Sequence, residues 1–308
     1  MLADRMPSKV NASTTCLDPL PSSRDQHIVE RRPETDELPA IFVINLDRAS
    51  ERRAAVDRHL RAVGVPYVRV SALDGETIEP EAAAAFVEAK IGAPRRRPLG
   101  PAEVACYASH LMVLRYVIAE QLAGALIVED DIEVIGDLRT ILLSLHKLDR
   151  SCVVAKLEGR EINRRNRGVV VDHIAGADLV SPLHAAVGAA AYYVTLDGAR
   201  AILDLCRTMT APFEEEVADR NRLQAHLLEL RPFPVRRQKG SVSYVRQDRI
   251  YANYRRRGNE RSPLAKLASK LGLPLRRLRR RLRLRRLAMA TARSIAGQLG
   301  ARPRWRRL

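Results

Sequence analysis

Short apolar runs alternate with amphipathic segments between residues 41 and 207. Residues 41–46 form the first apolar run and predict a buried strand, and residues 50–63 predict a helix that Ser50 caps and Gly64 ends. Residues 67–70 predict a second strand. Because a strand, a helix and a strand in this order typically build a parallel sheet covered by helices, the pattern predicts an α/β fold.

The rest of the apolar pattern extends the same scheme. Pro101 suits the first turn of a long helix that runs to about Gln121, after a shorter helix over residues 81–90. Residues 160–182 have no clear period, and we expect an irregular insert or a small hairpin there. The remaining predicted elements are strands at 125–128, 152–157 and 189–195 and a helix at 198–207.

The two ends of the chain differ from this pattern. Residues 1–38 are rich in Ser, Pro, Asp, Glu and Arg and have little periodicity, which predicts a disordered leader. In residues 251–308 leucines recur at helical spacing between arginines, which predicts an amphipathic helix in a separate Arg-rich tail. We therefore expect one globular domain over residues 39–250.

The net charge of the 308-residue chain is +17, and the tail carries it. Residues 255–308 hold 19 of the 53 Lys and Arg residues and one of the 36 acids, so the tail contributes +18 and the remainder −1. A globular part so close to neutral does not indicate a nucleic-acid-binding protein. A helix over residues 274–287 predicts binding to an anionic membrane surface, with a solvated basic tail or RNA binding as the alternatives.

The cysteines and the apolar runs bear on the cellular compartment. Cys16, Cys106, Cys152 and Cys206 match no zinc or CxxC spacing, and the apolar neighbours of Cys106 and Cys152 indicate buried free thiols. The N-terminus has no apolar signal core, and we expect no apolar run long enough to span a bilayer. We therefore expect a cytoplasmic protein, peripheral at the inner face of the membrane.

Three consecutive acids, Glu129, Asp130 and Asp131, follow the apolar run 125–128. Carboxylates this close repel one another and raise one another's pKa, and a divalent cation of the Mg²⁺ or Mn²⁺ kind relieves the repulsion. In an extended chain Glu129 and Asp131 share one side, while Asp130 points to the other or joins them after a turn. Because α/β folds collect ligands at the carboxyl ends of strands, the cluster predicts a metal site, with a solvated acidic turn as the alternative.

Other polar residues lie near the ends of the first two predicted strands. Asn45 and Leu46 end the first strand, and Arg48 and Arg52 follow it, where a helix N-terminus and arginines can receive phosphate. The alternative is a solvated helix face on which these arginines pair with nearby acids. Asp74, which precedes a glycine, is a turn residue first and a hydrogen-bond partner of a ribose or sugar hydroxyl second.

One face of the helix predicted after Pro101 carries Glu103, Cys106 and His110, at spacings i, i+3 and i+7. A metal site made of these three side chains is one interpretation. A packed face with a buried thiol and a hydrogen-bonded imidazole is the favoured one. A Cys–His nucleophile pair is less favoured, because both residues lie on one helix.

Together these segments resemble glycosyltransferase family 25, the lipopolysaccharide and lipooligosaccharide glycosyltransferases. The resemblance runs from about Ile41 to Ser241, and the order of the motifs makes a strong joint signal. The matching motifs are Ile44-Asn-Leu-Asp-Arg48-Ala-Ser-Glu-Arg52, Ala72-Leu-Asp74-Gly75, Ala102-Glu-Val-Ala-Cys106-Tyr-Ala-Ser109-His110, Leu126-Ile-Val-Glu129-Asp130-Asp131, Lys156-Leu-Glu158, and the stretch from Gly188 to Ala199 with Tyr192 or Tyr193.

The resemblance implies a GT-A-type, Rossmann-like mixed sheet flanked by helices, a nucleotide-sugar donor such as a UDP-sugar, and a divalent cation, Mn²⁺ or Mg²⁺. It implies inverting transfer of a hexose, galactose or glucose, onto a lipopolysaccharide-type, lipid-linked or other glycan acceptor. Glu129 and Asp131 take the metal positions. The implied nucleotide-sugar contacts are Asn45, Leu46, Arg48, Arg52, Asp74, Gly75, Ser109, His110 and Asp130.

The chain departs from the family pattern at two places. Ala102 and Ala105 replace two glycines of the helix motif, and a Pro-x-Asp segment of the family ends in Glu214 here. We expect Glu214 to remove the acceptor proton, with Asp219 as the reserve base.

Three other functions stay open. The Glu214 departure favours a non-catalytic glycosyltransferase-like domain, and the tail alone favours a nucleic-acid-binding protein. A metal-dependent phosphoesterase would use the same acids, but the sequence lacks the further carboxylates and histidines that a two-metal site needs.

Overall fold

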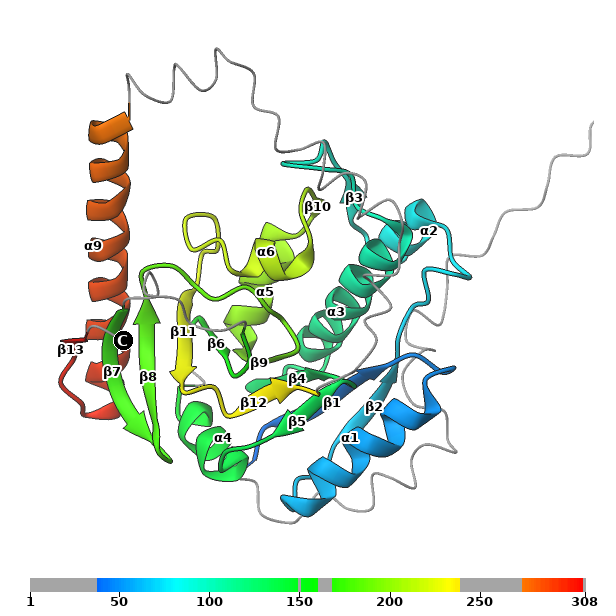
Figure 1. Ribbon diagram of the computed structural model, residues 1–308, viewed down its shortest axis with the longest axis horizontal. Helices are drawn as coiled ribbons and strands as arrows, with labels where there is room; N and C mark the ends of the chain where they lie inside the picture. The colour runs from blue at the N-terminus through cyan, green and yellow to red at the C-terminus, as the bar shows by residue number, and fades with distance from the viewer. Residues whose placement is uncertain (1–37, 149–150, 160–167, 239–272, 307–308) are drawn as a thin grey trace, which may run out of the picture.

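The computed structural model describes residues 38–148, 151–159, 168–238 and 273–306. The predicted leader, apart from residue 38, lies outside the described residues. So do residues 160–167 of the predicted insert and residues 239–272 before the C-terminal helix. The described residues form a mixed sheet with helices on both faces (Figure 1).

Nine strands form the main sheet. In spatial order they are β13 (Arg304–Arg306), β7 (Gly168–Ile174), β8 (Ala177–Pro182), β11 (His226–Arg231), β6 (Val153–Lys156), β9 (Ala191–Thr195), β4 (Gly124–Glu129), β1 (Ala40–Asn45) and β2 (Val68–Ser71). β1 is parallel to both of its neighbours, β2 and β4, and β6 is parallel to β11, while the other pairs are antiparallel. The predicted α/β fold with a mixed sheet is thus confirmed.

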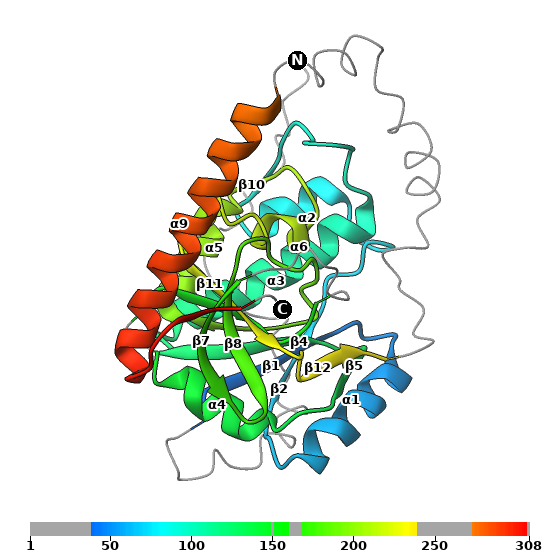
Figure 2. The same cartoon turned by 60° about the vertical axis from the view of Figure 1, so that its left-hand side comes forward.

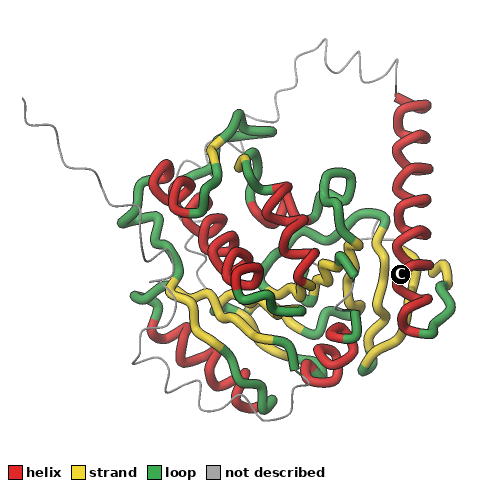
Figure 3. The backbone as a smooth tube through the Cα atoms, turned by 180° about the vertical axis from the view of Figure 1, so that it is seen from behind, coloured by secondary structure: helices red, strands yellow, loops and turns green. Residues whose placement is uncertain are grey.

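Helices cover both faces of this sheet, because each strand buries its side chains alternately on one face and the other. In β1, Ile41 and Val43 belong to the core of one face, and Phe42 and Ile44 belong to the core of the opposite face. The first face is covered by α1 (Ser50–Ala62) and α4 (Leu138–His146) (Figure 1). The second face is covered by α2 (Pro80–Phe86), α3 (Pro101–Ala119), α5 (Leu196–Leu205) and α6 (Phe213–Val217), as Figure 3 shows from behind.

The central helix α3 is buried along most of its 19 residues. By length and composition it could cross a membrane, which corrects the expectation that no apolar run has that length. However, 67% of the relevant window is buried inside the fold, where α3 packs against α2, α5 and the sheet. A helix that is apolar all round and enclosed in this way is a core helix of the domain.

Helix boundaries differ from their predictions at α1, α2 and α5, and α5 begins and ends two residues earlier than predicted. α1 begins at Ser50 itself, and its N-cap is Ala49, which makes no side-chain cap hydrogen bond. α2 is shorter than the helix predicted over residues 81–90. It stops early because Glu88 takes a φ of 50°, a left-handed conformation that an α-helix does not tolerate.

Two pairs of short strands and one hairpin complete the sheet structure. β3 (Lys90–Ile91) pairs with β10 (Thr208–Met209), and β5 (Ile132–Val134) pairs with β12 (Val235–Arg237). The region 160–182 contains the hairpin of β7 and β8, whose turn residues Ala175 and Gly176 have φ of 48° and 80°. Positive φ at both central positions suits a two-residue hairpin turn, so the hairpin alternative is confirmed for the described part of the region.

The Arg-rich tail, expected as a separate segment, is attached to the sheet where the structure describes it. α9 (Leu273–Leu299) lies along β7 and β8, and β13 adds an edge strand beside β7 (Figure 2). Ala292 and Ile295 are completely buried in the core of the first face. The buried guanidinium of Arg220 donates to the Thr291 hydroxyl at 2.8 Å. The apolar side of the last turns of α9 is therefore used inside the fold.

Candidate functional site

The parallel strands β1, β2 and β4 end at one edge of the sheet, and a pocket of about 340 Å³ opens there. Loops after all three strands contribute to its walls, because the carboxyl ends of parallel neighbours meet at the same edge. α1, α3, the start of α6 and the end of β12 also contribute lining residues. The predicted site residues that line this pocket are Leu46, Arg48, Arg52, Asp74, Gly75, Ser109, His110, Glu129, Asp130, Asp131 and Glu214.

The three acids at the end of β4 have two different sets of partners, because side chains alternate in direction along an extended chain. Arg237 donates to Glu129 Oε2 and to Asp131 Oδ2, both at 2.8 Å. Asp130 Oδ2 instead accepts from the amide nitrogen of Asn45 at 2.7 Å. Arg52 bridges the groups, since its Nη2 lies 2.7 Å from Asp130 Oδ1 and 3.1 Å from Asp131 Oδ2. Two guanidinium groups thus hold three carboxylates together.

Burial and neighbouring charge act in opposite directions on these acids. Burial raises the pKa of Asp130 to about 6 although Arg52 and Asn45 act to lower it. Burial, and then the charge of Glu129, raise the pKa of Asp131. Burial would also raise the pKa of Glu129, but Arg237 and His110 hold that pKa at about 2. Glu129 is therefore a stable anion, and the cluster retains negative charge that a proton or a cation can compensate.

Arg237 is the site residue that the sequence did not reveal. It ends β12, and the antiparallel pairing with β5 sets it opposite Ile132, directly after the acids. The charge of Glu129 is the largest influence on Arg237 and raises its pKa, so the guanidinium stays positive. In the sequence Arg237 lies 106 residues after Asp131, and only the pairing of two three-residue strands brings them together.

Asn45 lies beneath the acids and is buried. Its amide nitrogen donates to Asp130 and, at 3.2 Å, to the carbonyl oxygen of Ala49, and its own amide oxygen accepts from Arg69 Nε at 3.0 Å. The described lining of the pocket does not include Asn45. It therefore orients Asp130 from behind and acts on a bound ligand through that carboxylate.

The loop after β2 is fastened by the residues that the sequence singled out. Arg48 Nε donates to Asp74 Oδ2 at 2.5 Å, and Arg48 Nη2 donates to Glu76 Oε1 at 2.9 Å. Asp74 also accepts from the Glu76 backbone N–H at 3.0 Å, which is the predicted turn role. Gly75 packs so closely against α3 that an added Cβ would lie 2.5 Å from the Ala102 nitrogen. These contacts fix one wall of the pocket.

Ser109 ties that wall to α3. Its hydroxyl accepts from the Leu73 backbone N–H at 2.9 Å and donates to the carbonyl oxygen of Ala105 at 2.8 Å. Ser109 is buried, so both hydrogen bonds are sheltered from water. In this structure the hydroxyl positions the loop that carries Asp74.

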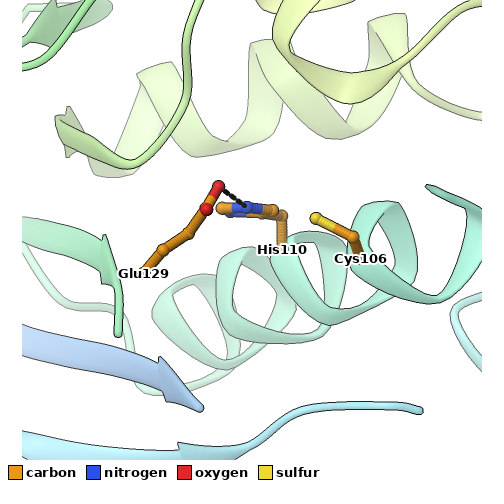
Figure 4. A group of neighbouring side chains, drawn as sticks. All are labelled: Cys106, His110 and Glu129. Carbon is orange, nitrogen blue, oxygen red and sulfur yellow. Dashed lines mark ion pairs between the residues drawn. The ribbon is translucent and has the colours of Figure 1, made fainter. Parts of the chain in front are cut away.

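His110 is held from two sides. Its ring stacks on Phe213, with centroids 4.4 Å and planes 9° apart, and its Nδ1 lies 3.0 Å from the Tyr192 hydroxyl. Its Nε2 faces Glu129 at 3.6 Å from Oε1 (Figure 4). The packed, hydrogen-bonded imidazole that the sequence favoured is confirmed.

Cys106 lies beside His110, one helical turn earlier on α3 (Figure 4). Burial raises the pKa of its thiol well above the usual value, so Cys106 is neutral. Glu103 does not join these two residues. Its carboxylate accepts from the Gly100 N–H at 3.0 Å and pairs with Arg97 at the start of α3, so the Glu103 member of the predicted helix face is a capping residue.

Glu214 and Asp219, expected as base and reserve base, are placed differently. Glu214 lies in the first turn of α6 and lines the pocket. Asp219 lies beyond α6, pairs with Arg95 at 3.0 Å, and is not among the described residues that line the pocket. Glu214 is therefore in the pocket where a base is expected, whereas Asp219, expected as the reserve base, is in an ion pair outside the described lining.

Comparison with known proteins identifies a family whose model matches this chain. The family model described as glycosyltransferase family 25 (LPS biosynthesis protein) matches residues 38–217. A glycosyltransferase 25 family member of Drosophila melanogaster is 30% identical over 110 residues, which cover 34% of this chain and 18% of that protein. Procollagen galactosyltransferase 2 of Mus musculus and of Homo sapiens are each 30% identical over 118 residues, which cover 37% of this chain and 19% of those proteins. The matched part of the chain spans less than a fifth of the length of these curated relatives.

The contact between Asn45 and Asp130 predicts a pH-dependent loss of stability in Asn45→Asp. The new carboxylate keeps an acceptor for Arg69 but faces Asp130, whose pKa is already raised to about 6. A second acid raises the folded-state pKa of the pair further, so the folded chain binds more protons than the unfolded chain between pH 4 and 8. Stability must then fall as pH rises through that window.

Urea unfolding at pH 5 and pH 8 measures this effect. Relative to the unsubstituted chain, we expect Asn45→Asp to lose about 1–3 kcal/mol more unfolding free energy at pH 8 than at pH 5. This loss corresponds to a pKa shift of about one to two units. Gln224→Glu, the same chemical change at an exposed position, is the control and should show no such difference. An equal loss at both pH values would contradict the assigned contact.

Proposed function

The chain belongs to glycosyltransferase family 25, and from this premise we propose that it transfers a hexose from a UDP-sugar to a glycan acceptor with inversion at the anomeric carbon. The observation that carries the proposal is the pocket at the carboxyl edge of β1 and β4, where Glu129, Asp130 and Asp131 meet arginines from two separate parts of the chain. Acids and cations gathered at this edge suit a donor that carries a diphosphate.

The arginines supply the anion-binding part of the proposal. Arg48, Arg52 and Arg237 all line the pocket, and guanidinium groups pair well with phosphate oxygens. The side chains of Arg48 and Arg237 keep 37% and 41% of their surface exposed, so a ligand can reach them without unfolding the site. The diphosphate would lie among these groups, with the nucleoside toward Leu46 and the Asp74 loop.

A hard divalent cation, Mn²⁺ or Mg²⁺, fits the acid cluster by the chemistry of its donors. Carboxylate oxygens are the ligands that these ions prefer, and burial raises the pKa of Asp130 and Asp131 although Arg52 acts to lower both, so a cation beside them would favour their ionised forms. Glu129 and Asp131 would hold the ion, while Asp130 stays with Asn45 and Arg52. Bound there, a cation would supply charge neutralisation for the diphosphate leaving group.

Glu214 is the proposed general base. Its carboxylate would take the proton of the acceptor hydroxyl while that oxygen bonds to the anomeric carbon and the bond to the diphosphate oxygen breaks. Arg52 and Arg237 would hold the departing diphosphate on the opposite side of the sugar. Glu214 lines the same pocket as these arginines, so one bound donor could contact both.

The sugar and acceptor are proposed from the relatives. Two relatives are named for galactosyl transfer to procollagen, and the family description names LPS biosynthesis. We propose galactose or glucose as the donor sugar and a lipopolysaccharide-type or lipid-linked saccharide as the acceptor. A non-catalytic glycosyltransferase-like domain is the second candidate, because this chain has Glu214 at the position of the Asp in the family's Pro-x-Asp segment.

We further propose that the chain works in the cytoplasm at an anionic membrane surface. Arg283, Arg285 and Arg286 of α9 are exposed, while Leu284 between them is buried. Because the apolar side of these turns packs on the protein, the membrane contact would be electrostatic rather than an insertion of leucines, which revises the interfacial helix expected from the sequence. Binding to RNA through the same arginines is the alternative outcome.

Thermal unfolding with UDP, GDP or CMP, each with and without Mn²⁺, tests the donor site. We expect UDP with Mn²⁺ to raise the Tm most, by roughly 5–10 °C at about 100 times Kd. Asp131→Asn should lose the Mn²⁺-dependent part of this shift, because an amide carries no charge for the cation. Asp137→Asn, an exposed N-cap of α4 whose role Asn can fill, is the control. A full Mn²⁺-dependent UDP shift in Asp131→Asn would refute the assignment.

A transfer assay tests the base. We expect Glu214→Gln to lower kcat by about 10²- to 10⁴-fold, with donor binding retained, because the amide cannot accept the proton. Glu215→Gln alters the neighbouring carboxylate, which pairs with Arg96 at 3.4 Å, and should keep its activity. Unchanged kcat in Glu214→Gln would remove Glu214 as the base. Binding of UDP without any transfer by the unsubstituted chain would favour the non-catalytic domain.

Co-sedimentation of the full chain with phosphatidylglycerol vesicles tests the membrane contact. Arg285→Glu with Arg286→Glu should weaken binding by at least about 2 kcal/mol, or about thirtyfold, since each basic side chain near the surface contributes about 1 kcal/mol. Arg58→Glu with Arg139→Glu changes the net charge equally at exposed positions of α1 and α4 and is the control. Equal loss in both double variants, or tighter binding to RNA than to vesicles, would overturn the proposal.

A further inference from the structure

Cys106, His110 and Glu129 form a second cluster in the pocket wall, with chemistry unlike that of the three acids. One ligand atom from each side chain lies within 4.8 Å of the others. Cys106 and His110 are four residues apart and project from one face of α3, and Glu129 faces them from the end of β4 (Figure 4). We propose that these three side chains bind a thiophilic divalent cation of the zinc class, with the Cys106 thiol releasing its proton to solvent as its sulfur bonds to the ion and a solvent molecule or bound ligand as the fourth donor.

The imidazole of His110 is held in an orientation that leaves one ring nitrogen available to such an ion. Its Nε2 is buried and has no hydrogen-bond partner among the described residues, which is unfavourable for a buried polar atom. Its other nitrogen, Nδ1, lies 3.0 Å from the Tyr192 hydroxyl, and Phe213 stacks on the ring. Metal-binding histidines commonly donate their second N–H to a neighbouring oxygen, which leaves the lone pair of the first nitrogen for the ion.

The spacing of the three groups suits tetrahedral coordination. Zinc bonds of about 2.0–2.3 Å to nitrogen, oxygen and sulfur place neighbouring ligand atoms roughly 3.3–3.6 Å apart. His110 Nε2 and Glu129 Oε1 are already 3.6 Å apart. The separations to the Cys106 sulfur are at most 4.8 Å, so ion binding would require the Cys106 side chain to move by about 1 Å toward the other two ligands.

The donor types separate this site from the acid cluster of the proposed function. Thiolate and imidazole favour Zn²⁺ and Co²⁺, whereas Mg²⁺ and Mn²⁺ favour carboxylate oxygens. Glu129 belongs to both groups, but its two oxygens are divided: Oε2 accepts from Arg237, and Oε1 faces His110. A zinc-class ion would therefore approach Oε1 and leave the contact with Arg237 in place.

Titration of the reduced, full-length chain with Co²⁺ tests this inference by absorption spectroscopy. We expect a thiolate-to-cobalt charge-transfer band together with the visible bands of tetrahedral Co²⁺, both removed by excess Zn²⁺. Cys106→Ser should abolish the charge-transfer band, and Cys152→Ser, at a partly exposed cysteine outside this pocket, should keep it. Circular dichroism and thermal unfolding of each variant exclude loss of the fold.

A second variant tests the orientation of His110. Tyr192→Phe removes only the hydroxyl next to Nδ1 and should weaken Co²⁺ binding about 10- to 100-fold while the charge-transfer band persists at saturation. No band in the folded, unsubstituted chain, or a band that survives Cys106→Ser, would overturn the site. Because the readout is a cobalt–thiolate spectrum, its failure is distinct from failure to bind UDP or to transfer sugar.

Discussion

Three carboxylates at the end of one strand, two of them buried and Glu129 partly exposed, are the constraint around which this pocket is built. Glu129, Asp130 and Asp131 lie too close to ionise without positive neighbours, and each of the two arginines among them comes from a different element. Arg52 projects from α1 and Arg237 from β12, so the packing of both elements is coupled to the charge of the site. Removing either cation would leave buried negative charge, which costs several kcal/mol.

Much of this arrangement could be predicted from the sequence, because its signals are local. The first strand, the helix after it and the acids behind the fourth strand of the chain each follow from apolar period and spacing within a few residues. Arg237 could not be found this way, because its place depends on the pairing of two short strands distant in sequence. The attachment of α9 was missed for a related reason. Alternating leucines and arginines indicate an amphipathic helix, but they do not say whether its apolar side meets a membrane or the sheet.

The residues implied by the family motifs do two different jobs. Arg48 and Arg52 line the pocket, Arg48 with an exposed and Arg52 with a partly buried side chain, while Asn45 and Ser109 are buried and hydrogen-bond to Asp130 and to the loop of Leu73. The motif residues therefore cluster in space, but only some of them line the pocket and the others position those that do. Ser109 and Gly75 illustrate this, because both hold the loop after β2 against α3 and so shape the pocket from its wall.

Glu129 connects the parts of the pocket that differ most in chemistry. Its low pKa makes it an anion at all physiological pH values, so its two oxygens must be compensated continuously. One oxygen accepts from Arg237, which also binds Asp131, and the other faces the imidazole of His110. A cation bound beside His110 would share the negative charge of Glu129 with Arg237, which contacts the other carboxylate oxygen and also Asp131. The pocket thus responds to charge as one network, because the carboxylate at its centre is shared.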